Sequence, residues 1–439
     1  MLPLSANVNR WLGTFSVSAL NALVGLTTGI ILARFLAPDG RGELAIIMFW
    51  PPLIASLLIF GLPASATYHA ARMEGDRHDR FTATLIGLAV LISAAMVAIA
   101  WLAIPFVVKD PHLVTVTRIY AAILLPFHCI AIVLQALDQG RLRFGTFNLT
   151  RLLPQAIYFL GLVILITLES VSLPAILICH IAGVAMTALF RLAIHRRSIG
   201  SGVDFSAARD VLRTGARFHP GQLLTIIRSQ ADRLLIVLFF SGSDVGLYVV
   251  AATLAAQPLV LVNSSFNLLL FPRVAAASDP VEKNRLVGQS FRLCAIAVTP
   301  VLLLIVLLAP FLVTLIFGQA YAGAGQVAQV LAVAFAISGL RDVLIEALRG
   351  YNDRMIRVWS EAAMLVLFAA MVFASAGLGT VAIAAAFGAS AFLSMLLLVW
   401  AMHRAYGLAW ADLWPFGMRG LADIRQILQA RGLLSVRGS

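Results

Sequence analysis

Long stretches without a charged residue are the feature that most constrains how this chain can fold. The earlier stretches contain no Asp, Glu, Lys or Arg, and the later ones tolerate a few charges. A helix needs roughly 20 apolar residues to cross about 30 Å of hydrocarbon, so the pattern predicts about twelve transmembrane helices. The stretches comprise residues 11–33, 44–71, 81–108, 119–137, 152–168, 170–190, 218–240, 246–272, 293–317, 325–345, 358–374 and 381–402.

Composition agrees with this prediction. Hydrophobic residues make up 61% of the 439 residues and charged residues only 12%, values that a water-soluble domain could not accommodate. Cys129, Cys179 and Cys294 lie inside predicted helices and have no metal-binding spacing, so we interpret them as small buried apolar residues. We therefore expect an all-α integral membrane protein.

The distribution of arginine predicts the orientation in the membrane. Lys109 and Lys283 are the only lysines among 32 basic residues. If the N-terminus is cytoplasmic, most basic residues fall in cytoplasmic loops and tails, which is the positive-inside pattern. We therefore expect a multi-pass protein of the bacterial inner membrane with both termini in the cytoplasm. Basic residues that flank spans face anionic membrane lipids, which explains the net charge of +12 without a nucleic-acid partner.

The chain divides into two similar halves. ARFLAPDGRGELAI at 33–46 and VLFFSGSDVGLYVV at 237–250 share a helix, a tight Gly-containing turn and a returning helix. Six helices in each half would make both halves enter from the same side, so we expect two six-helix lobes related by a parallel two-fold around a central cavity. The predicted parts are an N-terminal lobe at 1–194, a cytoplasmic interfacial linker at 195–214, a C-terminal lobe at 215–402 and a cytoplasmic amphipathic tail at 403–439.

Motifs of soluble enzymes are missing from the sequence. It contains no GxxxxGK[ST], HExxH, paired-cysteine motif or nucleophile elbow, so we expect neither ATP hydrolysis nor a metal or other cofactor. The predicted external loops are short. An embedded glycan polymerase or ligase would need a sizeable external loop to hold its acceptor, so an enzyme is disfavoured.

The stretch 217–240 stands out because Arg228, Asp232 and Arg233 fall near its middle. Each charge at the centre of a membrane helix costs about 2.5–3.5 kcal/mol on translocon scales, so such residues rarely face lipid. Arg228 and Asp232 are one helical turn apart and could pair. Two interpretations remain open: an internal ion pair that joins helices, or a cationic lining of a water-filled cavity, which we favour.

Other charged residues are weaker candidates because they lie near helix ends, where long side chains reach water cheaply. Arg34, Arg41 and Arg118 are predicted to be external, against the positive-inside trend. For Arg341, beside Asp342 and Glu346, we favour an anchoring role over a binding role. A cationic cavity would suit phosphate, which the planar guanidinium binds in a bidentate way. The candidate substrate-binding residues are Arg34, Arg41, Arg118, Arg228, Asp232, Arg233 and Arg341.

Four segments resemble a known family. They are ARFLAPDGRGELA from residue 33, DFSAARDVLRTGARFHPG at 204–221, ADRLLIVLFFSGSDVGLY at 231–248 and FPRVA at 271–275. The chain is similar to the polysaccharide-biosynthesis (oligosaccharide flippase, Wzx-like) branch of the multidrug/oligosaccharidyl-lipid/polysaccharide exporter superfamily. That resemblance implies two six-helix lobes and alternating access. It also implies a cationic cavity, a role that best fits Arg34 and the group formed by Arg228, Asp232 and Arg233.

The implied function is to move an undecaprenyl-pyrophosphate-linked oligosaccharide from the cytoplasmic to the periplasmic leaflet, without enzymatic activity. Expected partners are this lipid-linked oligosaccharide, membrane lipids, other polysaccharide-assembly proteins of the membrane, and a coupling ion, either H⁺ or Na⁺. Two alternatives stay open. One is a drug/cation antiporter, although its acidic membrane motifs have no clear copy here, and the other is a membrane-embedded glycan polymerase or ligase.

Overall fold

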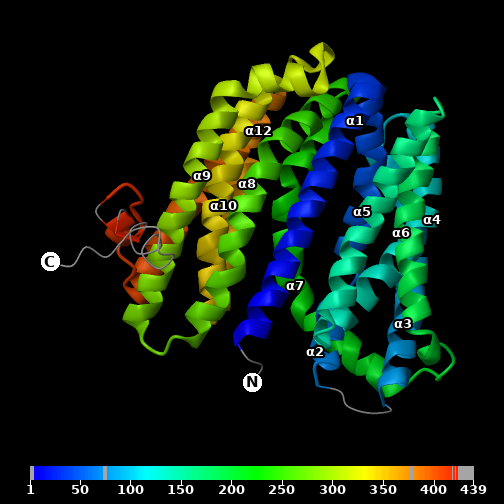
Figure 1. The fold of residues 1–439 in the computed structure, drawn as a ribbon, viewed down its shortest axis with the longest axis horizontal. Coiled ribbons are helices and arrows are strands. Elements are labelled where there is room, and N and C mark those ends of the chain that lie inside the picture. Colours follow the sequence, from blue (N-terminus) through cyan, green and yellow to red (C-terminus); the bar gives the residue numbers. More distant parts are fainter. Residues whose placement is uncertain (1–3, 73–76, 375–378, 418, 421, 424–439) are drawn as a thin grey trace. The chain divides into compact units, whose positions relative to one another are not determined.

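The structure is a computed structural model that describes residues 4–72, 77–374, 379–417, 419–420 and 422–423. Every regular element in these residues is a helix (Figure 1). Ten of the helices are long and apolar enough to cross a membrane. The expectation of an all-α integral membrane protein is therefore confirmed.

Two details reconcile these ten helices with the larger number of predicted spans. The first helix runs from Leu4 to Leu58 but has a non-helical residue at Ala37, so it is two helices joined end to end. The helix Phe205–Phe239 is 35 residues long, but its polar residues keep it out of the ten apolar helices. A break in one helix and the polarity of another thus account for the difference.

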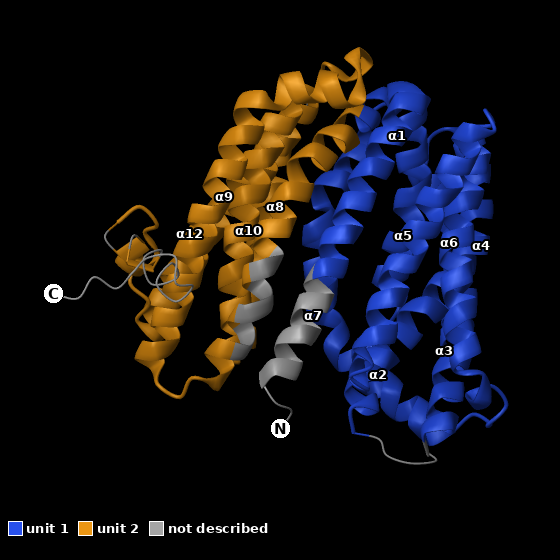
Figure 2. Cartoon of the chain, in the orientation of Figure 1, with its two compact units in different colours: residues 1–246 blue, residues 247–439 orange. Residues whose placement is uncertain are grey.

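The chain forms two compact units, residues 1–246 and 247–439 (Figure 2). The predicted lobes at 1–194 and 215–402 are a different division, based on the predicted membrane spans, and they stay a prediction. The first unit contains α1 (Leu4–Leu58), α2 (Leu62–Ala70), α3 (Arg77–Val107), α4 (Pro111–Gly140), α5 (Phe144–Thr167), α6 (Leu173–Ile194), the short η1 (Arg196–Ser198), α7 (Phe205–Phe239) and the start of α8 (Gly242–Ala276). The second contains the rest of α8, α9 (Pro280–Phe317), the short η2 (Gln319–Tyr321), α10 (Ala324–Gly350), α11 (Arg354–Ala374), α12 (Gly379–Tyr406) and α13 (Trp410–Leu413).

Polar caps fix where several helices begin. Asp110, Ser172, Asp204 and Asp279 each accept a hydrogen bond from a backbone N–H in the first turn of α4, α6, α7 and α9. Such caps satisfy donors that have no partner within the helix. The pKa of Asp204 is lowered, chiefly by the hydrogen bond from the Ser206 hydroxyl. The first part of α7, predicted as a separate interfacial segment, is therefore capped and continuous with the predicted span.

The turn between α4 and α5 recurs between α10 and α11. Residues 141–143 and 351–353 each connect two helices, and the middle residue of each turn, Leu142 or Asn352, is left-handed with φ of 57° or 59°. In both turns, the N–H of the last residue donates to the carbonyl five residues earlier at 3.0 Å. Each unit therefore contains its own copy of this connection, which supports the internal repeat predicted from the sequence.

Within the first unit, two glycine-containing turns make reciprocal contacts. A Cβ atom at Gly42 would collide with the backbone carbonyl of Gly242, and a Cβ atom at Gly246 would collide with that of Pro38. Positions 38 and 42 correspond to 242 and 246 in the repeat. Position 38 of the first turn thus contacts position 246 of the second turn, and position 42 contacts position 242. This exchange of equivalent positions is the pattern of a two-fold contact. Only glycine allows this backbone approach.

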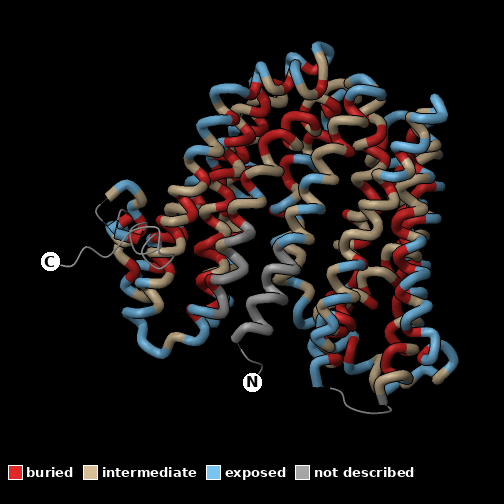
Figure 3. Tube along the Cα trace, in the orientation of Figure 1, coloured by how far each residue is buried: buried red, intermediate tan, exposed pale blue. Residues whose placement is uncertain are grey.

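In each unit, one helix is buried along more than half of its most apolar stretch, α4 in the first and α10 in the second (Figure 3). Small residues let neighbouring helices approach α10 closely, since a Cβ at Gly325 would crowd Pro310 and one at Gly339 would crowd Asn263.

In the tail, Arg292 of α9 binds Asp423 at 2.7 Å, while Trp410, Trp414 and Phe416 are exposed. Leu421, Ile424 and Leu428 of the predicted amphipathic tail lie outside the described residues.

We predict that Gly42→Ala lowers the unfolding temperature of the detergent-purified protein. The added methyl group has no room beside the Gly242 carbonyl, and overpacking of this kind costs about 1–3 kcal/mol. Gly145→Ala is the matched control, because an added Cβ there meets no atom within 4 Å apart from the neighbouring backbone of its own helix. Equal unfolding temperatures for the two variants would contradict the tight turn contact.

Candidate functional site

The charged middle of α7, by which we mean residues 228–233 at the middle of the predicted span 217–240, is the centre of the candidate site. Arg228 and Asp232 are buried, with 7% and 2% of their surface exposed, and lie one turn apart on the helix. Arg233 is exposed. The same helix segment therefore carries a buried Arg and Asp on one face and an exposed Arg on another. Both alternatives considered for this group, an internal ion pair and a cationic lining, remain compatible with that arrangement.

Arg34 and Arg41 lie on the two sides of the break in α1 at Ala37. Arg34 is exposed and Arg41 is partly buried, within electrostatic range of Tyr158 on α5. In the first unit α1 also contacts α7. The fold thus brings the helices that carry Arg34, Arg41, Arg228, Asp232 and Arg233 together in one unit.

Arg118 and Arg341, the two remaining candidate arginines, contact residues of neighbouring helices. Arg118 on α4 donates from Nε to the carbonyl of Trp101 on α3 at 2.8 Å, and its guanidinium lies 5.1 Å from the centre of the indole ring. Arg118 therefore connects α3 to α4. A substrate-binding role for Arg118 or Arg341 stays a prediction.

Arg341 has no exposed surface. Its guanidinium donates to Ser394 of α12 at 3.0 Å and to Ser360 of α11 at 2.9 Å, and it lies 3.5 Å from the Glu361 carboxylate. These contacts enclose the side chain inside the second unit and join three helices. Arg341 also lies 3.8 Å from the carboxylate of Asp342, its neighbour in the sequence, whereas Glu361 comes from another helix.

The sequence did not predict a buried polar cluster in the first unit. Asp138 of α4 and Arg191 of α6 are both fully buried and form a salt bridge of 2.9 Å. Arg191 also donates to Thr150 of α5, and the His195 ring lies 3.4 Å from the other Asp138 oxygen. The cluster therefore holds together α4, α5 and α6. The two partners are far apart in the chain and each lies near a helix end, so no local pattern indicated the pair.

Histidines in the first unit serve as packing and hydrogen-bonding groups. His180 bonds the Tyr120 hydroxyl at 2.8 Å and its ring packs edge-on against Tyr158. His219 stacks on Phe60, and His69 bonds Thr214 at 3.2 Å. Within the described residues, no group of three or more His, Cys, Asp or Glu side chains could hold a metal ion.

Comparison with known proteins identifies the family. The family described as "Polysaccharide biosynthesis protein" matches residues 31–326, more than half of the chain. The chain belongs to this family. A curated relative, the amylovoran biosynthesis protein AmsL of Erwinia amylovora, is 31% identical over 106 residues, which cover 24% of this chain and 27% of the relative. The match thus spans about a quarter of the length of that relative.

Solved structures of transporters share the fold. A lipid II flippase MurJ in an inward closed conformation has a TM-score of 0.75 at 12% identity, over 97% of this chain and 93% of that chain. A multidrug resistance MATE family transporter of the MOP superfamily, facing inward, has a TM-score of 0.73 at 16% identity, over 90% and 98%. A MOP superfamily transporter from Pyrococcus furiosus has a TM-score of 0.61 at 14% identity, over 90% and 96%. The family member described here therefore has the fold of MOP superfamily transporters.

We predict that Asp138→Leu strongly lowers the unfolding temperature, because it leaves the Arg191 charge buried without its carboxylate. Breaking a buried ion pair costs about 3–5 kcal/mol, whereas replacing both partners with apolar residues is often close to neutral. Thermal unfolding of the purified protein should therefore show a partial recovery in the double variant Asp138→Leu/Arg191→Met.

Glu282→Leu is the control for this experiment. It removes a carboxylate from a largely exposed pair with Arg285, whose closest distance is 3.9 Å, and exposed pairs contribute about 0–1 kcal/mol. A double variant that is no more stable than Asp138→Leu alone would show that the pair does not act as a unit.

Proposed function

We propose that this protein is a flippase that moves a polyprenyl-pyrophosphate-linked oligosaccharide from the cytoplasmic to the periplasmic leaflet of the inner membrane, for the synthesis of a polysaccharide. The observation that carries the proposal is the charged middle of α7 in a member of a polysaccharide biosynthesis family. Arg228 and Arg233 bring positive charge into a segment long enough to span the membrane. A phosphate group is an anion that guanidinium groups bind well, through paired hydrogen bonds.

The physical task explains why a protein is needed at all. Sugar hydroxyls and phosphate charges cannot enter hydrocarbon alone, since each unsatisfied polar group costs several kcal/mol. Alternating access between two lobes would move the head group past the midplane while it stays in a polar site. The polyprenyl tail would remain in lipid. The similarity of fold to a lipid II flippase and to a MATE family transporter supports this mechanism.

The proposal includes the remaining expectations from the sequence. Both termini would be cytoplasmic, and no cofactor or catalytic residue would take part. Transport in one direction needs an energy source, which would be a gradient of H⁺ or Na⁺ or consumption of the product by other membrane proteins of polysaccharide assembly. Among the candidate site residues, the arginines of α1 and α7 would bind the pyrophosphate or acidic sugars.

An antiporter of drugs or cations is the second candidate function. The observation that favours it is the buried carboxylate of Asp232 on α7, together with the fold shared with a multidrug resistance transporter. Such a carboxylate could exchange a proton or metal cation for a cationic substrate. This function would depend on Asp232 more than on the arginines, which separates it from the flippase by mutation.

We predict that cells depleted of the protein accumulate lipid-linked oligosaccharide on the cytoplasmic leaflet. Leaflet-specific analysis of the lipid-linked intermediates should detect it. An embedded polymerase would instead cause single repeat units to accumulate on the periplasmic face, and a drug antiporter would leave the glycan unchanged.

We further predict that Arg233→Gln and Arg228→Ala reduce polysaccharide export several-fold, measured in the depleted strain with each variant restored. Arg233 is exposed, so its variant should keep the unfolding temperature of the native protein. Arg285→Gln, which removes another exposed guanidinium, near the start of α9, is the matched control. Normal export in both α7 variants, or greater dependence on Asp232 than on the arginines, would count against the proposal.

A further inference from the structure

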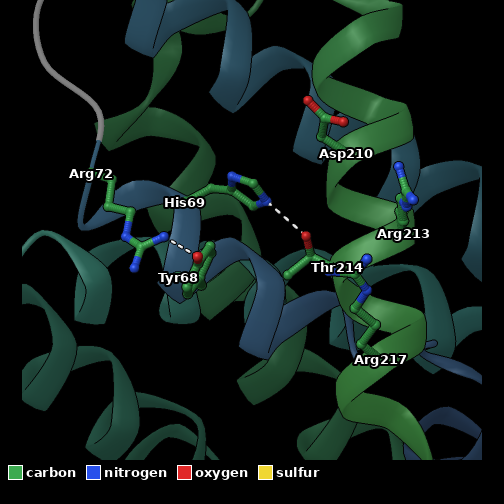
Figure 4. Close-up of a pocket in the computed structure, with 7 residues that line it drawn as sticks. All are labelled: Tyr68, His69, Arg72, Asp210, Arg213, Thr214 and Arg217. Carbon is green, nitrogen blue, oxygen red and sulfur yellow. Dashed lines mark hydrogen bonds between the residues drawn. The ribbon is translucent and has the colours of Figure 1, made fainter.

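A pocket lies in the first unit between the C-terminal end of α2 and the first half of α7 (Figure 4). Its volume is about 410 Å³, within the range of roughly 300–1,000 Å³ that is typical of small-molecule sites. Two segments about 140 residues apart in the sequence supply all of its lining. The lining residues are Tyr68, His69, Arg72, Asp210, Arg213, Thr214 and Arg217.

Close backbone contact fixes the two walls of this pocket. A Cβ atom at Gly61 would collide with the carbonyl of Gly215, and one at Gly215 would collide with that of Phe60. The Ser65 hydroxyl, fully buried, donates to the carbonyl of Val211 at 2.8 Å. Helices held this closely present their side chains in a fixed arrangement, which is what a binding site requires.

The lining is cationic and rich in hydrogen-bond donors. Arg72, Arg213 and Arg217 outnumber the one carboxylate, Asp210. The Arg72 guanidinium lies 3.8 Å from the centre of the Tyr68 ring and donates to its hydroxyl, so the two side chains hold each other in place. Arg213 and Arg217 are one turn apart, and like charges at this spacing destabilise a helix. A bound anion would relieve that repulsion.

The surroundings of the pocket place it at the surface of the membrane. The segment that leads into α7 exposes Ile199, Val203 and Phe205, which have 55%, 51% and 83% of their surface accessible. Arg196 and Arg197 are exposed in the same segment. Exposed apolar residues beside arginines are typical of a segment that lies in the headgroup region of a bilayer. A pocket beside such a segment is within reach of the phosphate groups of lipid headgroups.

We propose that this pocket binds the phosphate or pyrophosphate of a lipid headgroup. Phosphate oxygens would accept hydrogen bonds from the three guanidinium groups, with hydroxyl donors at Tyr68 and Thr214 beside them. The lipid is either an anionic phospholipid or a polyprenyl pyrophosphate. In the second case, which rests on the proposed function, the pocket is a site where the substrate is captured before it reaches the charged middle of α7.

The test measures binding of inorganic pyrophosphate to the full-length protein in detergent by calorimetry. Arg213→Gln/Arg217→Gln should weaken binding at least about tenfold, because hydrogen bonds to charged groups contribute on that order each. Arg197→Gln/Arg209→Gln is the matched control. It also removes two positive charges, one from η1 and one from α7, but leaves the pocket lining intact. Its pyrophosphate affinity should stay within about twofold of that of the native protein.

Thermal unfolding verifies that both double variants are folded. Arg72→Gln, in the other wall of the pocket, is an independent variant that should also weaken pyrophosphate binding. Equal weakening by the pocket and control variants would mean that only diffuse surface charge attracts the anion, and this result would overturn the proposal. Absence of saturable binding to the native protein would overturn it as well.

A second arm distinguishes the source of the phosphate. The protein is placed in phosphatidylcholine nanodiscs that contain either phosphatidylglycerol or a sugar-free polyprenyl pyrophosphate, and pyrophosphate binding is measured again. Competition by one lipid identifies it as the occupant, and competition by neither contradicts the proposal. Transport is not measured in either arm, so a negative flippase assay with intact pocket binding would refute the proposed function alone.

Discussion

Hydrocarbon offers no hydrogen-bond partner to a peptide group, so each membrane-spanning segment must satisfy its own backbone, and helices are the result. The same solvent does not drive helices together, because lipid tails are as apolar as leucine side chains. Association then depends on close backbone contact and on polar groups that find one another. Both devices are present in the first unit, where Gly42 meets Gly242, Gly61 meets Gly215, and Asp138 binds Arg191.

Charge placement follows from this constraint and points to function. The buried guanidiniums of Arg191 and Arg341 each meet a carboxylate and a hydroxyl from neighbouring helices, so they join helices within one unit. The middle of α7 differs, because it carries two arginines, one buried and one exposed, beside a single carboxylate. In a member of a polysaccharide biosynthesis family, that excess of positive charge is the feature from which we infer an anionic, lipid-linked substrate.

Much of the fold could be predicted from the sequence because a membrane imposes a simple rule on each segment separately. Charge-free stretches indicated the helices, and the turn at Ala37 and its counterpart near Ser241 indicated the repeat. The continuity of 205–239 was missed, since its mixed first turns have the pattern of a surface helix. Of the site, the residues on α7 could be singled out because charge is rare in such a segment. The Asp138–Arg191 pair and the pocket of Arg72 and Arg213 could not, because each depends on how distant segments pack.

The central claim is that this chain carries a lipid-linked saccharide across a bilayer. Reconstitution of the purified protein in vesicles with a labelled polyprenyl-pyrophosphate oligosaccharide tests it most directly, with a membrane-impermeant glycosidase added outside. If the account is right, the fraction of label accessible to the glycosidase rises over time in vesicles with the native protein and much more slowly with Arg233→Gln. Equal accessibility in protein-free and protein-containing vesicles, with the protein shown to be folded and both orientations present, would contradict it.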